Sequence, residues 1–130
     1  MMLMLLGIMV VAHAQTCRDK SNLIIGKIEA DGTVRNASNL RIGKFDSDGA
    51  IRNASNILVG RIDGTSIRDK SNIRIGIVEA DGTVRDASNI KIGHVESSGT
   101  VRDKSNIKIG SAEGVNPKQA AVFYFFKLFK

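Results

Sequence analysis

The sequence contains few of the residues that build cross-links or reactive sites. It has one cysteine, two histidines, one proline and no tryptophan, and aromatic residues make up 5% of its 130 positions. A single cysteine excludes an intramolecular disulfide framework. No Cys/His, Ser/His/Asp or metal-binding cluster can be assembled from so few ligands and bases. We therefore expect no catalytic residues, no metal site and no cofactor, and predict that the protein is not an enzyme.

Long apolar runs are also scarce. The run Met1–Ala12 is shorter than the ~20 residues that a membrane-spanning helix needs. It contains no acidic residue and ends in Ala12-His13-Ala14, an A-x-A cleavage pattern, although it lacks an early Lys or Arg. We interpret residues 1–14 as a secretory signal peptide; the alternative is a buried N-terminal strand or helix. The interpretation predicts export to the periplasm, the outer envelope or the extracellular space.

Repetition is what the sequence has in abundance. The pattern R-[DN]-[AK]-S-N-x-x-[IV]-G-x-x-[ED], followed by a turn and a short apolar segment, recurs over residues 15–110. Its complete units are Arg18–Val34, Arg35–Ile51, Arg52–Ile67, Arg68–Val84 and Arg85–Val101, and a truncated sixth runs from Arg102 to Gly110. The third unit is one residue shorter than the others. Such a repeat predicts one repetitive domain rather than several independent ones.

Each unit has the pattern of two short strands. In the second unit, Leu40 and Ile42 alternate with polar neighbours, and the spacing then slips by one residue before Phe45, across Gly43. Alternation is typical of a strand, and a glycine at a phase slip indicates a β-bulge. We expect about four apolar side chains per unit in the core, here Leu40, Ile42, Phe45 and Ile51.

The turns carry the clearest local signals. Ala30-Asp31-Gly32 and its equivalents predict a type I turn with a G1 bulge, which places Ile28 opposite Val34. In the shortened unit, Asp63-Gly64 predicts a two-residue hairpin. The sequence from Asp46 to Gly49 is similar to the start of a calcium loop but lacks the later ligands, so we interpret it as another hairpin turn.

Together these signals predict an all-β fold. We expect a repetitive antiparallel hairpin meander of about eleven strands, which either coils as a β-solenoid or closes into a small barrel, with a C-terminal capping helix. Cys17 falls in the apolar column of the repeat, where a free cysteine behaves as a small hydrophobic residue.

The C-terminal segment, residues 111–130, departs from the repeat. It reads as a linker followed by Asn116-Pro117, a helix cap and first helical position, and an apolar helix over 118–130. The helix could cap the open end of the array, anchor the protein in a membrane interface, or form a dimerisation or partner surface; a C-terminal strand is a further alternative. The candidate membrane or partner contacts are Phe123, Phe125, Phe126 and Phe129.

Repetition also aligns polar side chains in columns. The arginine column offers a ligand-binding stripe for phosphate or acidic glycan, with Arg35, Arg52, Arg68 and Arg85 as candidates. The simpler interpretation is a ladder of cross-strand ion pairs such as Glu29 with Arg35, which we favour. The Ser-Asn column indicates turn chemistry. The repeats lack aromatic stacking residues, which argues against nucleic acid as a partner.

Parts of the sequence resemble known repeat families. Phe45-Asp-Ser-Asp-Gly-Ala50 is similar to the hairpin of cell-wall choline-binding repeats, and Asp-x-x-Gly turns occur in YD repeats. Both resemblances imply an extended hairpin array, but the aromatics that form choline sites are missing here. The whole unit, with its cleavage site and Phe-rich end, more closely resembles uncharacterised exported short-repeat proteins of Bacteroidetes-type bacteria, which implies an envelope or secreted protein.

The function expected from the sequence is a non-enzymatic structural or binding role at the cell envelope or outside the cell. The alternative is a glycan- or cell-wall-binding module that uses the arginine and asparagine columns. Glycan, an envelope protein, or a membrane surface reached through the C-terminal helix are the partners considered.

Overall fold

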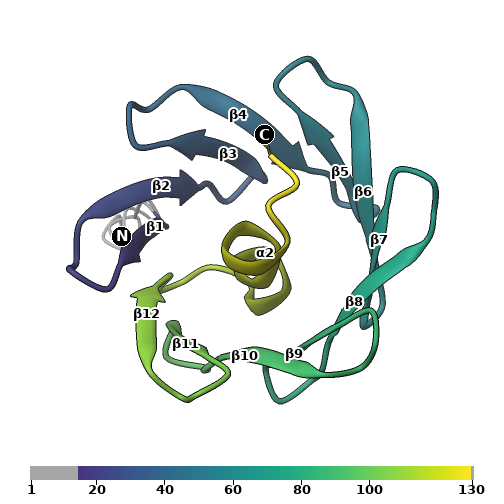
Figure 1. Ribbon diagram of the computed structural model, residues 1–130. Coiled ribbons are helices and arrows are strands. Elements are labelled where there is room, and N and C mark those ends of the chain that lie inside the picture. Colours follow the sequence, from purple (N-terminus) through teal and green to yellow (C-terminus); the bar gives the residue numbers. More distant parts are fainter. Residues whose placement is uncertain (1–14, 130) are drawn as a thin grey trace, which may run out of the picture.

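A computed structural model describes residues 15–129, so the proposed signal peptide at 1–14 lies outside the described residues. Consecutive strands pair antiparallel, and β1 pairs with β12, so the sheet closes on itself (Figure 1). The predicted all-β hairpin meander is confirmed, and it forms a closed barrel rather than a solenoid. The strands are β1 (Thr16–Asp19), β2 (Ile24–Ile28), β3 (Thr33–Asn36), β4 (Arg41–Phe45), β5 (Ala50–Asn53), β6 (Leu58–Asp63), β7 (Ser66–Asp69), β8 (Arg74–Val78), β9 (Thr83–Asp86), β10 (Lys91–Val95), β11 (Thr100–Asp103) and β12 (Lys108–Ser111).

The short turns between β2 and β3 and their equivalents lie at one end of the barrel, which we call the turn end. The predicted geometry is confirmed: the Gly32 N–H donates to the Glu29 carbonyl, Gly32 has φ +95°, and Ile28 pairs with Val34. The shortened unit differs from its prediction by one position. Asp63 pairs with Ser66, so the two loop residues are Gly64 and Thr65.

The loops between β1 and β2 and their equivalents lie at the opposite end, which we call the loop end. In the first of them the Asp19 carboxylate accepts hydrogen bonds from the Ser21 and Leu23 N–H groups at 2.9 and 3.0 Å. Asn22 adopts a left-handed conformation with φ 69°, which asparagine tolerates better than most residues. The other five loops repeat both features, so the Ser-Asn column is confirmed as turn chemistry.

A β-bulge follows each loop. Arg35 pairs with Arg41 and Val34 with Gly43, which leaves Ile42 as the extra residue. The predicted bulge is confirmed, one residue before the glycine that signals it. Leu40 precedes β4 and is 63% exposed, so its assignment to the core was wrong. Leu40 and Ile42 alternate with polar residues as in a strand, but the strand begins only at Arg41, so Leu40 lies in the preceding loop.

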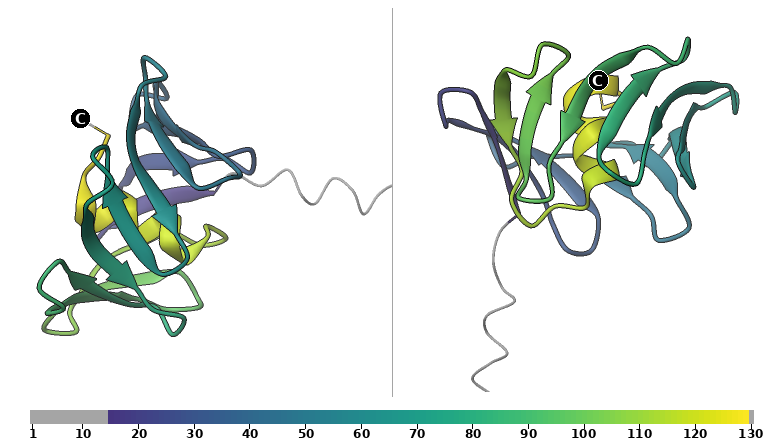
Figure 2. Two further views of the ribbon diagram at one scale, coloured as in Figure 1. Left: turned by 90° about the vertical axis from the view of Figure 1, so that its right-hand side faces the viewer. Right: turned by 90° about the horizontal axis from the view of Figure 1, so that it is seen from below.

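The C-terminal segment occupies the centre of the barrel. The helix α2 (Pro117–Ala121) and the π-helical turn η2 (Val122–Phe126) follow one another there. Figure 1 shows α2 encircled by the strands, and the views of Figure 2 show the yellow C-terminal segment lying between them. The Asn116 side chain caps α2 as predicted, accepting from the Lys118 and Gln119 N–H groups. The expected helix over 118–130 is shorter than predicted, and α2 lies in the centre of the barrel rather than over an end. A closed sheet has no terminal repeat to cap.

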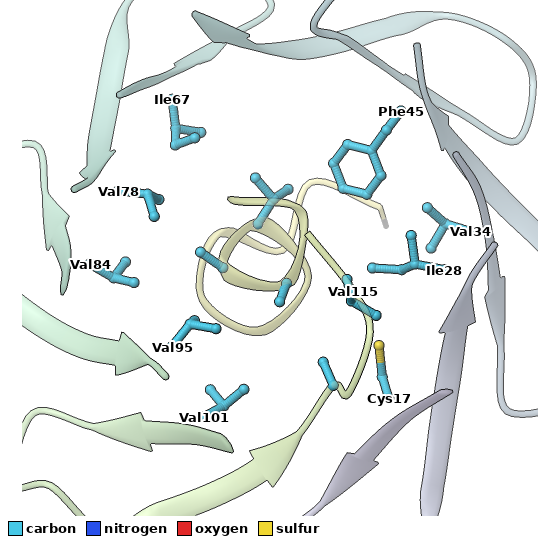
Figure 3. Packing of buried hydrophobic residues seen from close by; sticks show 14 of the residues in the cluster. Cys17, Ile28, Val34, Phe45, Ile67, Val78, Val84, Val95, Val101 and Val115 are labelled. Atoms are coloured by element: carbon cyan, nitrogen blue, oxygen red, sulfur yellow. The ribbon is translucent and has the colours of Figure 1, made fainter. Parts of the chain in front are cut away.

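The core forms around α2. Branched aliphatic side chains from neighbouring strands point at the helix, whose own contribution is the small side chains of Ala120 and Ala121 (Figure 3). Cys17 belongs to this layer and is fully buried, as predicted. The other buried side chains of the layer include Ile28, Val34, Phe45, Ile51, Ile67, Val78, Val84, Val95 and Val101.

Candidate functional surface

The tail, residues 122–129, packs against the glycine column of the repeat. A methyl group added at Gly26 would lie 2.7 Å from Phe123 Cζ and 2.7 Å from the Arg35 carbonyl oxygen. Each of the other five glycines likewise faces one tail side chain and one arginine carbonyl. The pairs are Gly26 with Phe123, Gly110 with Tyr124, Gly93 with Phe125, Gly76 with Phe126, Gly60 with Leu128, and Gly43 with Phe129. The glycines therefore provide the space that the tail side chains occupy.

The tail winds around the barrel axis one hairpin at a time. Residues 123 to 129 contact the hairpins in the order in which these adjoin around the sheet, and Lys127 is the only residue passed over. Lys127 adopts a left-handed conformation with φ 48° and is exposed. A cavity of about 350 Å³ lies where the winding begins and ends, lined by Ile25, Ile42, Phe123, Tyr124, Lys127 and Phe129.

Tyr124 occupies the position where the barrel closes. Its hydroxyl lies 2.6 Å from the Arg18 carbonyl oxygen on β1 and 2.9 Å from the Ser111 carbonyl oxygen on β12. One hydroxyl can donate to either strand, so it links the first strand to the last. Burial raises the pKa of Tyr124 above its usual value, which keeps the hydroxyl a donor.

The aromatic residues that the sequence proposes as contacts are thus brought together inside the loop end. Phe123, Phe125, Phe126 and Phe129 are half-buried, each against its glycine. Phe129 also packs edge to face on Phe45, with ring centroids 5.3 Å apart. These rings close the barrel at this end and leave part of their surface exposed there.

The arginine column forms the predicted ladder on the outer face. Arg35 Nε donates to Glu29 at 2.9 Å, and its Nη1 donates to the Asn39 carbonyl at 3.2 Å. Arg52, Arg85 and Arg102 repeat the arrangement with Asp46, Glu79 and Glu96, whereas Arg68 forms a looser ion pair with Asp63 at 3.6 Å. The ion pairs are confirmed, and they tie the turn and the loop of neighbouring segments together. Each guanidinium is about one-third exposed.

The most exposed of the large apolar side chains form a set that sequence reasoning missed. The residue that follows the left-handed asparagine is leucine or isoleucine in every loop, and it is 58–65% exposed. We call this set the aliphatic ring: Leu23, Leu40, Ile57, Ile73, Ile90 and Ile107. The signal was present in the sequence, because the position is aliphatic in all six units, but alternation assigned it to the core.

Charge is divided between the two ends of the barrel. Exposed basic side chains of the loops and tail gather at the loop end: Lys20, Arg41, Lys70, Arg74, Lys91, Lys104, Lys108 and Lys127. Most acidic residues lie in or beside the short turns: Glu29, Asp31, Asp46, Asp48, Asp63, Glu79, Asp81, Glu96 and Glu113. Asp19, Asp69, Asp86 and Asp103 also lie at the loop end, so the eight basic side chains exceed the carboxylates there by four, whereas carboxylates predominate beside the turns.

Acidic side chains at both ends also serve the backbone. The Thr33 N–H donates to the Asp31 carboxylate at 2.9 Å, and this hydrogen bond lowers the pKa of Asp31. The Thr83 N–H lowers the pKa of Asp81 in the same way.

Burial raises the pKa of the Cys17 thiol to about 12, so Cys17 is a neutral core residue rather than a nucleophile.

Within residues 15–129, no group of three or more His, Cys, Asp or Glu side chains is placed to hold a metal ion. His94 lies half-buried on the outer face of β10, opposite Arg102. None of the helices in the described part of the chain is long and apolar enough to cross a membrane.

A comparison with protein families gives a match over nearly the whole chain. No curated protein and no solved structure matches the sequence. Residues 14–128 match a repeat family described as 5-fold beta-flower protein. The expectation of a short-repeat family is supported, but the match is not to choline-binding or YD repeats and is not specific to Bacteroidetes-type bacteria. The chain belongs to the 5-fold beta-flower protein family.

Proposed function

We propose that this small beta-flower repeat protein is an exported, non-catalytic binding protein that acts at the cell envelope or outside the cell, with the loop end as its contact surface. The observation that carries the proposal is the aliphatic ring, six leucine and isoleucine side chains exposed at one end of a closed barrel. Exposed apolar groups gathered in one area mark interaction sites in soluble proteins.

The non-catalytic part of the proposal is supported by the recurring polar side chains. Every recurring arginine donates to an asparagine carbonyl, and four of them also donate to a carboxylate. The side-chain oxygens of the loop Asp and Asn residues accept backbone N–H groups. The recurring arginines, and the Asp or Asn that opens each loop, therefore have partners within the fold. The export part is supported by the apolar run and cleavage pattern of residues 1–14.

Glycan or cell-wall binding through Arg35, Arg52, Arg68 and Arg85 is the second candidate. Its support is the regular spacing of four guanidinium groups on the outer face, each about one-third exposed. Arg35, Arg52 and Arg85 donate to carboxylates, and all four arginines donate to asparagine carbonyls. Fewer donors are left for a ligand, which is why we place the contact surface at the loop end.

Fractionation of cells that express the tagged full chain tests export. We expect the protein in the periplasm, envelope or medium, with Gln15 as its first residue by mass spectrometry. Retention of residues 1–14 on a cytosolic protein would contradict the export proposal.

Binding to isolated envelope fractions tests the contact surface. We expect Leu40→Ser, Ile57→Ser and Ile90→Ser together to reduce binding, whereas Arg52→Gln and Arg85→Gln leave it unchanged. The opposite result would favour the arginine stripe.

A further inference from the structure

We propose that the loop end docks on the surface of a bilayer rich in anionic phospholipid, with the aliphatic ring inserted at the interface and the surrounding basic side chains against the headgroups. The proposal rests on the proposed function and names its partner. Two independent observations carry it: the identity of the ring residues and the separation of charge along the barrel axis.

The loop backbone does not require an aliphatic side chain at the ring position. In the third loop, the Ile57 N–H donates to Asn53 Oδ1 and its carbonyl accepts from the Asn53 N–H. Any residue except proline provides those two groups. The side chain is 58% exposed, yet leucine or isoleucine stands here in each of the six loops. Six exposed aliphatic groups at one end suit a partner that takes up hydrocarbon.

The charge distribution favours a negatively charged partner and orients the protein on it. Basic side chains surround the aliphatic ring, whereas the loop carboxylates, such as that of Asp69, each accept two backbone N–H groups. An anionic membrane surface attracts basic side chains. The long side chains of lysine and arginine place their charged ends at the headgroups while their apolar stems stay in contact with apolar surface. The acidic turn end would be repelled, so the loop end faces the membrane.

The centre of the same end is also apolar. The half-buried tail side chains and the cavity between Phe123 and Phe129 lie inside the aliphatic ring, with Lys127 beside them. Aromatic residues at the level of the headgroups suit a membrane interface. A single-stranded nucleic acid is bound through aromatic faces on which bases stack, whereas here each tail ring packs against a glycine and the loops carry no aromatic residue.

Co-sedimentation with vesicles tests the proposal directly. The full chain and a chain beginning at Gln15 are both used, because the apolar residues 1–12 can bind lipid themselves. We expect both proteins to bind vesicles of phosphatidylglycerol and phosphatidylcholine, and to bind phosphatidylcholine alone at least tenfold more weakly. Binding confined to the full chain, or equal binding to the two compositions, would overturn the proposal.

Charge variants with a matched control separate the loop end from net charge. Arg74→Gln, Lys91→Gln and Lys108→Gln remove three charges at the loop end, and Lys27→Gln, Lys44→Gln and Arg61→Gln remove three from the outer face nearer the turns. We expect the first set to weaken binding roughly fivefold per charge at low salt, and the second to weaken it far less. Equal losses would contradict the orientation.

Tryptophan fluorescence reports the orientation independently, because the sequence has no tryptophan. We expect Ile57→Trp, in the aliphatic ring, to shift to the blue on anionic vesicles, and Ser47→Trp, exposed at the turn end, to remain unchanged. A shift in Ser47→Trp alone would overturn the proposal. Circular dichroism and thermal unfolding verify that every variant is folded.

The envelope-binding assay distinguishes failure of this proposal from failure of the proposed function. If the protein ignores vesicles but binds an envelope protein or glycan fraction through the aliphatic ring, the lipid proposal is wrong and the contact surface stands. If ring variants bind neither more nor less than the parent in any fraction, both are wrong.

Discussion

The two halves of the barrel interior differ in which segment supplies the large side chains, the strands in one half and the C-terminal segment in the other. In the half near the turns, the strands contribute branched side chains such as Val84 and Ile67, and the central helix contributes Ala120 and Ala121. In the half near the loops, the strands contribute glycine, and the tail contributes phenylalanine, tyrosine and leucine. Small residues of one partner face large residues of the other in both halves.

This comparison shows that the side-chain sizes of the repeats and of the C-terminal segment must be complementary. A close-packed interior fixes the total volume of the facing side chains, not which chain segment supplies it. The packing of the half near the turns can therefore be predicted from the repeat alone. The glycines of the half near the loops are explained only by the tail side chains that pack against them. The following predictions test the comparison, from the largest expected effect to the smallest.

Removal of the tail should abolish the folded barrel. A chain that stops after Ala121 loses the buried Val122 and the six half-buried side chains that face the glycine column. Full burial of such a side chain contributes roughly 1.5–3 kcal/mol, and half-burial contributes less. We expect loss of cooperative thermal unfolding by calorimetry. Removal of Lys130 alone is the control and should leave unfolding unchanged. A truncated chain that unfolds at the parent temperature would show that the strands close without the tail.

Substitution in the glycine column should destabilise the protein by overpacking. In Gly26→Ala the new methyl group would meet Phe123 and the Arg35 carbonyl oxygen, both at 2.7 Å. We expect a loss of about 1–3 kcal/mol in the free energy of unfolding measured by urea denaturation.

Gly64→Ala is the matched control for steric contact, since nothing lies within 4 Å of the added methyl group. Gly64 has φ +62°, so alanine there costs about 1–2 kcal/mol of backbone strain. A second substitution that shortens the Phe123 side chain distinguishes the two variants. Phe123→Leu should recover part of the loss in Gly26→Ala and none in Gly64→Ala, and equal recovery would rule out the proposed contact.

The closure of the barrel should depend on the Tyr124 hydroxyl. Tyr124→Phe keeps the ring against Gly110 but removes the donor that lies near carbonyls of β1 and β12. We expect a loss of about 1 kcal/mol in unfolding free energy. Amide hydrogen exchange should accelerate in β1 and β12 more than in β6 and β7. Uniform acceleration would mean that the hydroxyl has no special role in closure.

Cys17→Val should have the smallest effect at neutral pH. Equivalent strand positions hold Val34, Ile51 and Val84, so valine fits the turn-side layer, and we expect a change below ~1.5 kcal/mol. The difference should appear in alkali. Burial raises the pKa of Cys17 to about 12, from about 8.5 in an unfolded chain. A raised pKa in the folded state favours the protonated thiol, so stability is full below pH ~8.5 and falls as pH rises toward 12.

Chemical denaturation from pH 7 to 11 measures this dependence. The parent should lose more stability than Cys17→Val over the range, because the other titrating groups are shared. Parallel curves would show that the thiol ionises in the folded protein at little cost.

Much of the fold followed from local patterns in the sequence. The turn at Gly32, the asparagine loops, the arginine ion pairs and the buried position of Cys17 each rest on contacts within one or two neighbouring strands. Ring closure and the place of the tail depend on contacts between residues about a hundred positions apart, such as Tyr124 with Arg18. No local pattern encodes such a distance. Leu40 and its equivalents were missed because alternation gives a side-chain phase but not the point where a strand ends.

One pairing described above constrains how the protein can evolve. Each hairpin receives one tail side chain, so the tail works as a ruler for the number of repeats. Duplication of a unit would create a glycine with nothing against it, and deletion would leave an aromatic residue with no place to pack. The number of repeats is therefore coupled to the sequence of the tail, a constraint that an open repeat array does not have. Variation in repeat number among relatives should therefore be accompanied by tails that are longer or shorter by one large apolar residue per repeat.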